Sequence, residues 1–200
     1  MRQYSATKRI AIFLAISIIN MALARYAALS ISNIPGVVTF YFAVVFMIPF
    51  ALWFGTLGVA AAYVGCFVGS GIPAGLTWQV NLFWSLGDLW QVLIPLLAFM
   101  LLKADIALKS KRDFGVFLVF GVVLNNLVGA LWGSGLFVLS GQFVYEDFWG
   151  LFTNWLLGNM LVTVLITPLL LRFVTPVVYK KSNAYFMNRK NREGNQAVNY

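Results

Sequence analysis

The chain contains no histidine and only one cysteine, Cys66, among its 200 residues. The missing histidine excludes acid–base chemistry, metal ligation and haem ligation that depend on imidazole. A single cysteine cannot form an internal disulfide, so a disulfide scaffold is excluded as well. Charged residues make up only 10% of the chain, against about 25% in an ordinary soluble domain. Because hydrophobic residues reach 61%, the charge cannot coat a water-soluble surface, and the sequence predicts an integral membrane protein.

Six apolar stretches have the length and composition of membrane helices. A helix needs about 20 apolar residues to cross about 30 Å of hydrocarbon. The stretches are Ile10–Ile31, Val38–Phe54, Leu57–Ile72, Val80–Leu102, Phe114–Leu139 and Phe148–Val178. None of them alternates between apolar and polar residues, so we predict an all-α fold, a polytopic membrane helical bundle with six transmembrane helices.

The basic residues orient these helices. Of the 14 Lys and Arg residues, all except Arg25 precede the first stretch, lie between the fourth and fifth, or fall at or beyond the end of the sixth. The loops on the other side, 32–37, 73–79 and 140–147, contain none. Cytoplasmic loops carry the excess of Lys and Arg, so both termini are expected in the cytoplasm of a multi-pass cell-membrane protein.

An alternative interpretation treats the N-terminus as a cleaved signal peptide. Arg2, Lys8 and Arg9 would then form its basic region, Ile10–Met21 its apolar region, and residues 22–24 its small-residue cleavage site. This would leave five helices and an external N-terminus.

The composition divides the chain into two parts. Residues 1–179 are expected to form one six-helix transmembrane domain, and residues 180–200 a disordered basic cytoplasmic tail, since they are polar and lack apolar periodicity. The net charge of +8 then reflects membrane topology and not nucleic-acid binding.

Two charged residues lie inside the apolar stretches, where each costs roughly 2.5–3.5 kcal/mol on insertion scales. Arg25 and Asp88 fall at similar depths below the outer ends of the first and fourth stretches. We therefore expect an Arg25–Asp88 ion pair in the outer half of the bundle. The pair would either line an outward-facing ligand pocket or act as a structural clamp between helices.

Polar and aromatic residues accompany this pair in the outer half of the bundle. Amides inside a membrane either join helices by hydrogen bonds or line a polar cavity, and tryptophans either form an interfacial belt or wall a ligand site. The candidate ligand-binding residues are Arg25, Asn81, Trp84, Asp88, Gln91, Asn126, Trp155 and Asn159.

No arrangement of residues suggests catalysis. Serines and threonines lack a histidine or a pair of carboxylates to activate them, and no glycine-rich phosphate loop occurs. We therefore expect a protein that is not an enzyme and that holds no metal and no cofactor.

Several motifs resemble those of the membrane-associated sensor (MASE-type) domain family of bacteria and archaea. They are the segment 108–113 (Leu-Lys-Ser-Lys-Arg-Asp), the pair Asn125-Asn126, the segment 155–159 (Trp-Leu-Leu-Gly-Asn) and the segment 167–171 (Thr-Pro-Leu-Leu-Leu). The resemblance covers about residues 38–173 and implies a multi-helix membrane sensor. The chain differs in having Asn159 where the family usually has Asp, fewer spans than usual, and a tail too short for a kinase or cyclase domain.

The chain also resembles the substrate-binding S components of energy-coupling-factor vitamin transporters. The similar features are the length, the six spans, the cytoplasmic termini, the Ala11-x-x-x-Ala15 spacing and the turn at 54–58 (Phe-Gly-Thr-Leu-Gly). This resemblance implies capture of a vitamin-like molecule from outside and pairing with a membrane coupling subunit and ATPases.

These observations lead to one expected function and two alternatives. The leading hypothesis is a sensor-type module in the lipid bilayer that binds an unidentified small molecule or partner on its outer side and signals through a membrane or cytoplasmic partner protein. The alternatives are a transporter S component and a structural subunit of a membrane complex. No nucleic-acid partner is expected.

Overall fold

The structure, a computed structural model, describes residues 6–30 and 38–182. Within these residues the fold is all-α, as predicted, and its strands are only two residues long. Four continuous helical segments are long and apolar enough to cross a membrane, and two further apolar helices are shorter. The long segments are Ala6–Tyr26, Trp78–Leu101, Lys111–Leu139 and Tyr145–Tyr179, and the shorter ones are Ala43–Phe54 and Thr56–Gly71.

Most of these segments comprise more than one helical element. The first long segment is the single helix α1 (Ala6–Tyr26), and the second comprises α4 (Trp78–Trp84) and α5 (Leu86–Leu101). The third comprises α6 (Lys111–Val116), η2 (Phe117–Leu124) and α7 (Asn125–Leu139). The fourth comprises η3 (Tyr145–Asp147), α8 (Phe148–Leu169), η4 (Leu170–Val174) and α9 (Thr175–Ser182). The shorter ones are α2 (Ala43–Phe54) and α3 (Thr56–Cys66) with η1 (Phe67–Gly71). Helix α9 runs a few residues into the expected tail, whose remainder, 183–200, lies outside the described residues.

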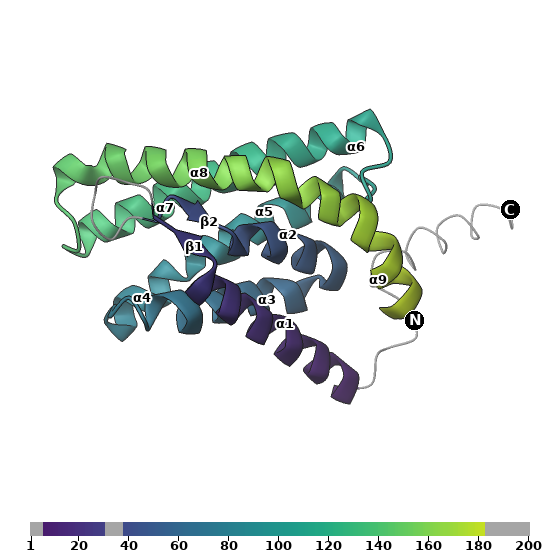
Figure 1. Cartoon of the computed structure of the whole chain (residues 1–200), viewed down its shortest axis with the longest axis horizontal. Coiled ribbons are helices and arrows are strands. Elements are labelled where there is room, and N and C mark those ends of the chain that lie inside the picture. The colour runs from purple at the N-terminus through teal and green to yellow at the C-terminus, as the bar shows by residue number, and fades with distance from the viewer. Residues whose placement is uncertain (1–5, 31–37, 183–200) are drawn as a thin grey trace, which may run out of the picture.

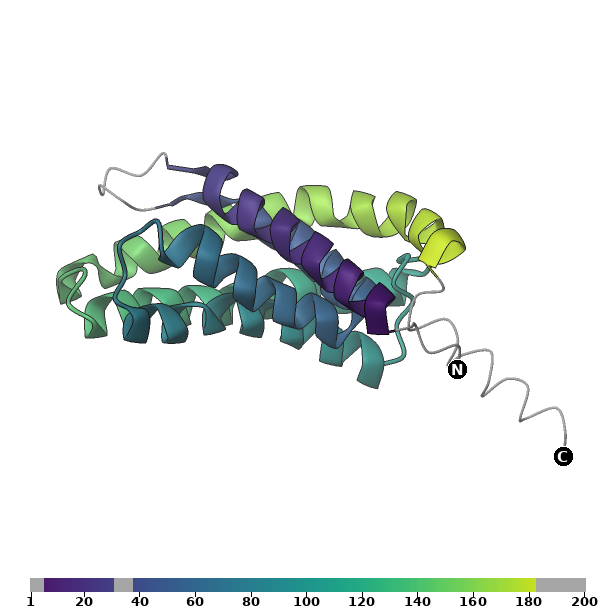
Figure 2. The ribbon, with the colours of Figure 1, turned by 90° about the horizontal axis from the view of Figure 1, so that it is seen from below.

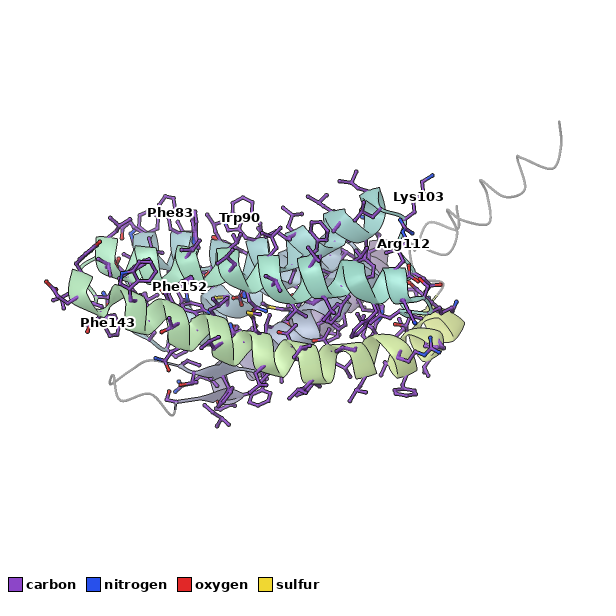
Figure 3. The ribbon with its side chains drawn as sticks, turned by 90° about the horizontal axis from the view of Figure 1, so that it is seen from above. Phe83, Trp90, Lys103, Arg112, Phe143 and Phe152 are labelled. Carbon is purple, nitrogen blue, oxygen red and sulfur yellow. The ribbon has the colours of Figure 1, made fainter. Side chains whose placement is uncertain are left out.

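The apolar segments run back and forth along one elongated bundle, so that α1 begins and α9 ends at the same end (Figure 1). The α2–α3 turn and the connection from α5 to α6 lie at that end too, whereas the α7–α8 connection lies at the opposite end. Seen from below, α1 lies obliquely along α3 (Figure 2), its principal packing partner. Lys103 and Arg112 lie together at the end near α9, and Phe143 and Phe152 lie towards the other end (Figure 3).

Two of the expected spans are wrong at their outer ends, because a short β-hairpin replaces helix there. The first span ends at Tyr26 and not at Ile31, and the second begins with a strand and not at Val38. Strand β1 (Ala28–Leu29) pairs antiparallel with β2 (Phe40–Tyr41). A short apolar run rich in β-branched and aromatic residues favours a strand, and hydrophobicity alone does not distinguish it from a helix.

Helix α2 forms the centre of the bundle. Its side chains from Ala43 to Trp53 are almost all buried, and it packs against α1, α3, α5 and α8. With 12 residues it is about 18 Å long, shorter than the hydrocarbon core of a bilayer. Gly55, with φ of 61°, reverses the chain into α3. A side chain at Gly58 would collide with the Phe50 carbonyl, so the glycine lets α2 and α3 pack backbone to backbone.

The connection from α5 to α6 is a well-defined loop. Asp113 accepts hydrogen bonds from the backbone and hydroxyl of Ser110 and from the backbone N–H of Asp105, and with Ser110 it forms a capping box for α6. Asp105 makes an ion pair with Lys109, at an N–O distance of 3.0 Å. The two acidic residues of this loop are therefore bonded within it.

Candidate functional site

The expected Arg25–Asp88 ion pair is wrong. Arg25 lies on an exposed face in the last turn of α1, with its guanidinium 5.9 Å from the ring centre of Tyr26. Asp88 is only 3% exposed, and its carboxylate accepts a hydrogen bond of 2.8 Å from the Tyr41 hydroxyl. Similar depth did not make the two residues neighbours, because α1 packs mainly against α3, and it is α3 that packs against α5.

Tyr41 joins two of the candidate residues. Its hydroxyl donates to Asp88 on α5, and its backbone N–H donates to Oδ1 of Asn159 on α8, at 3.2 Å. Asp88 lies ten residues after the start of α4, and Asn159 eleven residues after the start of α8. At 1.5 Å per residue both lie about 15 Å from the end of the bundle where α7 joins α8, near its middle. The hairpin therefore carries non-helical backbone deep into the bundle.

The end of α3 completes one side of this cluster. Cys66 is buried at the end of α3, close to Asp88 and Tyr41. Ser85, between α4 and α5, donates to the backbone carbonyl of Asn81 at 2.9 Å and to its Oδ1 at 3.2 Å. The amide of Asn81 donates in turn to the Phe67 carbonyl. These contacts connect η1, α4 and α5.

An aromatic group lies one helical turn from Asp88, towards the end of the bundle where α7 joins α8. The ring centres of Trp84 and Trp155 lie 5.1 Å apart, and Phe137 stacks on Trp84 at 4.1 Å. Gly133 makes room for Trp155, because a side chain there would overlap the indole ring. Both indole N–H groups are buried, and neither has a hydrogen-bond partner among the described residues.

Asn159 adds a third such donor. It is 1% exposed, and its Nδ2 has no hydrogen-bond partner in the described part of the chain, although its Oδ1 accepts from Tyr41. Trp155 and Asn159 are one helical turn apart on α8 and therefore share a face. The structure brings together Trp84, Asp88, Trp155 and Asn159, and we call these four residues with Tyr41 and Cys66 the Tyr41 site.

Two other candidates, Gln91 and Asn126, form a separate contact between α5 and α7. Nε2 of Gln91 donates to Oδ1 of Asn126 at 3.0 Å, and Nδ2 of Asn126 donates to the Val122 carbonyl of its own helix. The neighbouring Asn125 donates to the Gln91 carbonyl. These amides join the two helices, although Oε1 of Gln91 and Oδ1 of Asn125 are buried without a hydrogen-bond partner among the described residues. Arg25 lies apart from both groups.

An open groove of about 240 Å³ lies beside the Tyr41 site. Its lining residues come from β2 and α8 and are Thr39, Phe40, Thr153, Asn154, Leu157, Gly158 and Leu161. Phe40 and Gly158 immediately precede Tyr41 and Asn159 in the sequence, so the groove adjoins the strand and the helix that carry these two residues. A side chain at Gly158 would collide with the Thr39 carbonyl, which shows how closely the strand lies on the helix.

No motif in the sequence indicates the parts played by Tyr41, Cys66 and Ser85. Tyr41 falls in a segment predicted to be helix, and its place depends on a hairpin that no local motif announces. The described residues contain no group of three or more acidic or cysteine side chains that could hold a metal ion.

No protein-family model matches this chain, and no curated protein or solved structure is significantly similar to it. The two family resemblances therefore depend on sequence motifs alone. One of those motifs, 155–159, supplies two residues of the Tyr41 site.

Proposed function

We propose that the chain crosses the membrane six times with both termini in the cytoplasm. The support is the back-and-forth course of six apolar segments and the placing of Lys103, Lys109, Lys111 and Arg112 at the end where α1 begins (Figures 1 and 3). Positive residues favour the cytoplasmic side. Helix α2 is too short to cross alone, and the β-hairpin before it spans the remaining depth.

Cysteine labelling tests this topology. Replacing Cys66 by Ser gives a background without thiols, into which Lys109→Cys or Gln142→Cys is introduced. In intact cells a membrane-impermeant maleimide is expected to label the cysteine at 142 and not the one at 109, until the membrane is opened. Labelling of residue 109 in intact cells would refute the topology.

Within this topology the protein acts as a non-enzymatic sensor-type module that binds a small molecule at the Tyr41 site from the outer side. The single observation that carries this proposal is the buried Asp88, whose one hydrogen-bond donor among the described oxygen and nitrogen groups is the Tyr41 hydroxyl. Ionisable residues inside a membrane are costly and typically mark binding sites or ion pathways. The unpartnered donors of Trp84, Trp155 and Asn159 supply further groups for a ligand.

The binding proposal is tested by purifying the protein in mild detergent and identifying retained small molecules by native mass spectrometry. Asp88→Asn is expected to lose the bound molecule while keeping the helical content and the elution volume of the unaltered protein. Asp147→Asn, at the outer end of the bundle, serves as the control and is expected to retain it. Equal retention in both variants would exclude Asp88 from the site.

A transporter S component is the second candidate, and the irregular helix geometry at the site supports it. The helix runs on through Ser85 from α4 to α5, and after Cys66 it changes from α to π geometry. Short π-helical turns within α-helices frequently lie at functional sites. Co-purification with a membrane coupling subunit and ATPases, together with uptake of the bound molecule into cells, would favour transport over sensing.

A further inference from the structure

The charge around the Tyr41 site is one-sided. The other acidic residues that the structure describes, Asp105, Asp113, Glu146 and Asp147, lie at the two ends of the bundle, as the basic loop residues do. Asp88 alone lies deep inside, where its neighbours are the hydroxyl of Tyr41 and the thiol of Cys66. Arg25, which could have balanced it, is exposed on α1. The site therefore offers a carboxylate without a counter-cation, in surroundings that strengthen electrostatic attraction.

The walls of the site suit a positive charge as well. The faces of aromatic rings attract cations, and tryptophan does so most strongly. Trp84 lies one helical turn before Asp88, and its ring centre is 5.1 Å from that of Trp155. The hydrogen bond from the Tyr41 hydroxyl places the Tyr41 ring next to the same carboxylate. A carboxylate among three aromatic side chains is the chemistry that recognises an ammonium group.

We infer that the Tyr41 site binds a small organic ammonium compound, with its cationic group at Asp88 and against the neighbouring aromatic rings. The inference deepens the proposed binding function and rests on it. The free donors of Trp155 and Asn159 would take a hydroxyl or carbonyl oxygen elsewhere on the same molecule. The molecule enters from the groove between β2 and α8 when the Tyr41–Asn159 hydrogen bond, which joins strand and helix, opens.

The chain carries its own reporter for this inference. Cys66 is the only cysteine, and it lies beside Asp88. Two membrane-impermeant methanethiosulfonates of similar size, one bearing a trimethylammonium group and one a sulfonate, are added to right-side-out membrane vesicles containing the protein. Each rate is divided by the rate of the same reagent with the denatured protein. After this normalisation, the cationic reagent is expected to modify the folded protein at least about tenfold faster than the sulfonate reagent.

Two variants control the reporter. Asp88→Asn is expected to abolish the preference for the cationic reagent, whereas Asp147→Asn, which removes an equal charge at the outer end, keeps it. Cys66→Ser gives the background signal. If Asp88→Asn retains the preference, Asp88 is not the source of the selectivity and the inference is refuted.

Protection experiments use the unaltered protein and stay decisive if Asp88→Asn fails to fold. Choline is expected to slow the modification of Cys66 at concentrations at which dimethylbutanol, its neutral carbon isostere, has no effect. Equal protection by both compounds would overturn the ammonium inference. Protection by sodium chloride equal to that by choline would also overturn it, in favour of an inorganic cation.

The outcomes separate this inference from the proposal beneath it. Equal rates for the two reagents in folded protein would remove the cation preference and leave an outward-opening site standing. If neither reagent reaches Cys66 from outside while both modify the denatured protein, the site does not open outward, and the binding proposal fails together with the inference.

Discussion

Removal of a single oxygen, in Tyr41→Phe, tests whether β2 closes the buried cluster. The phenylalanine keeps the ring and its packing but loses the 2.8 Å hydrogen bond to Asp88. The strand loses this bond to α5 but keeps the 3.2 Å bond from its backbone N–H to Asn159 on α8 and its pairing with β1. We expect the hairpin to open more often in this variant.

The size of the effect follows from the contact that is lost. A buried hydrogen bond contributes about 1–2 kcal/mol here, between the averages measured in membranes and those for bonds to charged groups. A change of that size in the free energy of opening alters the equilibrium constant for opening about 5- to 30-fold. When closing is faster than the thiol reaction, the rate at which Cys66 is modified follows the open population. The neutral reagent N-ethylmaleimide should therefore modify Cys66 about 5- to 30-fold faster in Tyr41→Phe.

The matched control is Tyr145→Phe, which removes the hydroxyl of an exposed tyrosine at the outer end of the bundle. Its labelling rate should equal that of the unaltered protein, and all three proteins should react equally once denatured. A rate in Tyr41→Phe within twofold of the control would refute the idea that the Tyr41–Asp88 bond holds the strand in place, since it would correspond to less than about 0.5 kcal/mol.

Three further changes probe the packing of the bundle. Gly65→Val should lower the free energy of unfolding by about 1–3 kcal/mol, because the new side chain would meet Asn20 at the α1–α3 contact. The loss is measured as a lower midpoint of thermal unfolding in detergent. Gly135→Val, where a side chain meets nothing within 4 Å, is the control and should leave the midpoint nearly unchanged. Gln91→Leu and Asn126→Leu should show a coupling of about 0.6–1.7 kcal/mol in a double-mutant cycle of unfolding, and additive effects would contradict their hydrogen bond. Ser110→Ala removes the hydroxyl that caps α6 and should cost about 0.5–2 kcal/mol, measured by the same melts, with an unchanged midpoint counting against the capping box.

Much of the fold could be predicted because long apolar runs admit few structures. The segments Trp78–Leu101 and Lys111–Leu139 are helical almost as the sequence indicated, since every backbone group in a lipid-embedded helix is satisfied within the helix. The prediction failed before α2, where residues 38–41 are as apolar as a helix but form part of a hairpin. Their pairing with Ala28 and Leu29 depends on a partner strand that hydrophobicity does not reveal.

The candidate site was predictable in its residue types and not in its contacts. Buried polar groups inside an apolar run are costly, and this reasoning selected Asp88 and Asn159. Choosing the partner of Asp88 required knowing which helices are neighbours. Depth along a helix is readable from the sequence, but rotation and neighbourhood are not, so Arg25 was paired with the wrong helix while Tyr41 was overlooked.

The same reasoning explains why α8 carries an amide where the hairpin meets it. Strand backbone at this depth has no water to bond with, so each N–H needs a partner in the protein. The N–H groups of Thr39 and Phe42 bond to the carbonyls of Leu29 and Ala27 on the facing strand segment. The N–H of Tyr41 points the other way, towards α8, whose own carbonyls are engaged within the helix, and the side chain of Asn159 supplies the missing acceptor. An amide that accepts with its oxygen keeps its N–H₂ group free. The residue that makes a non-helical segment tolerable at mid-depth therefore also carries a free donor, and its structural role leaves that donor available for the binding proposed above.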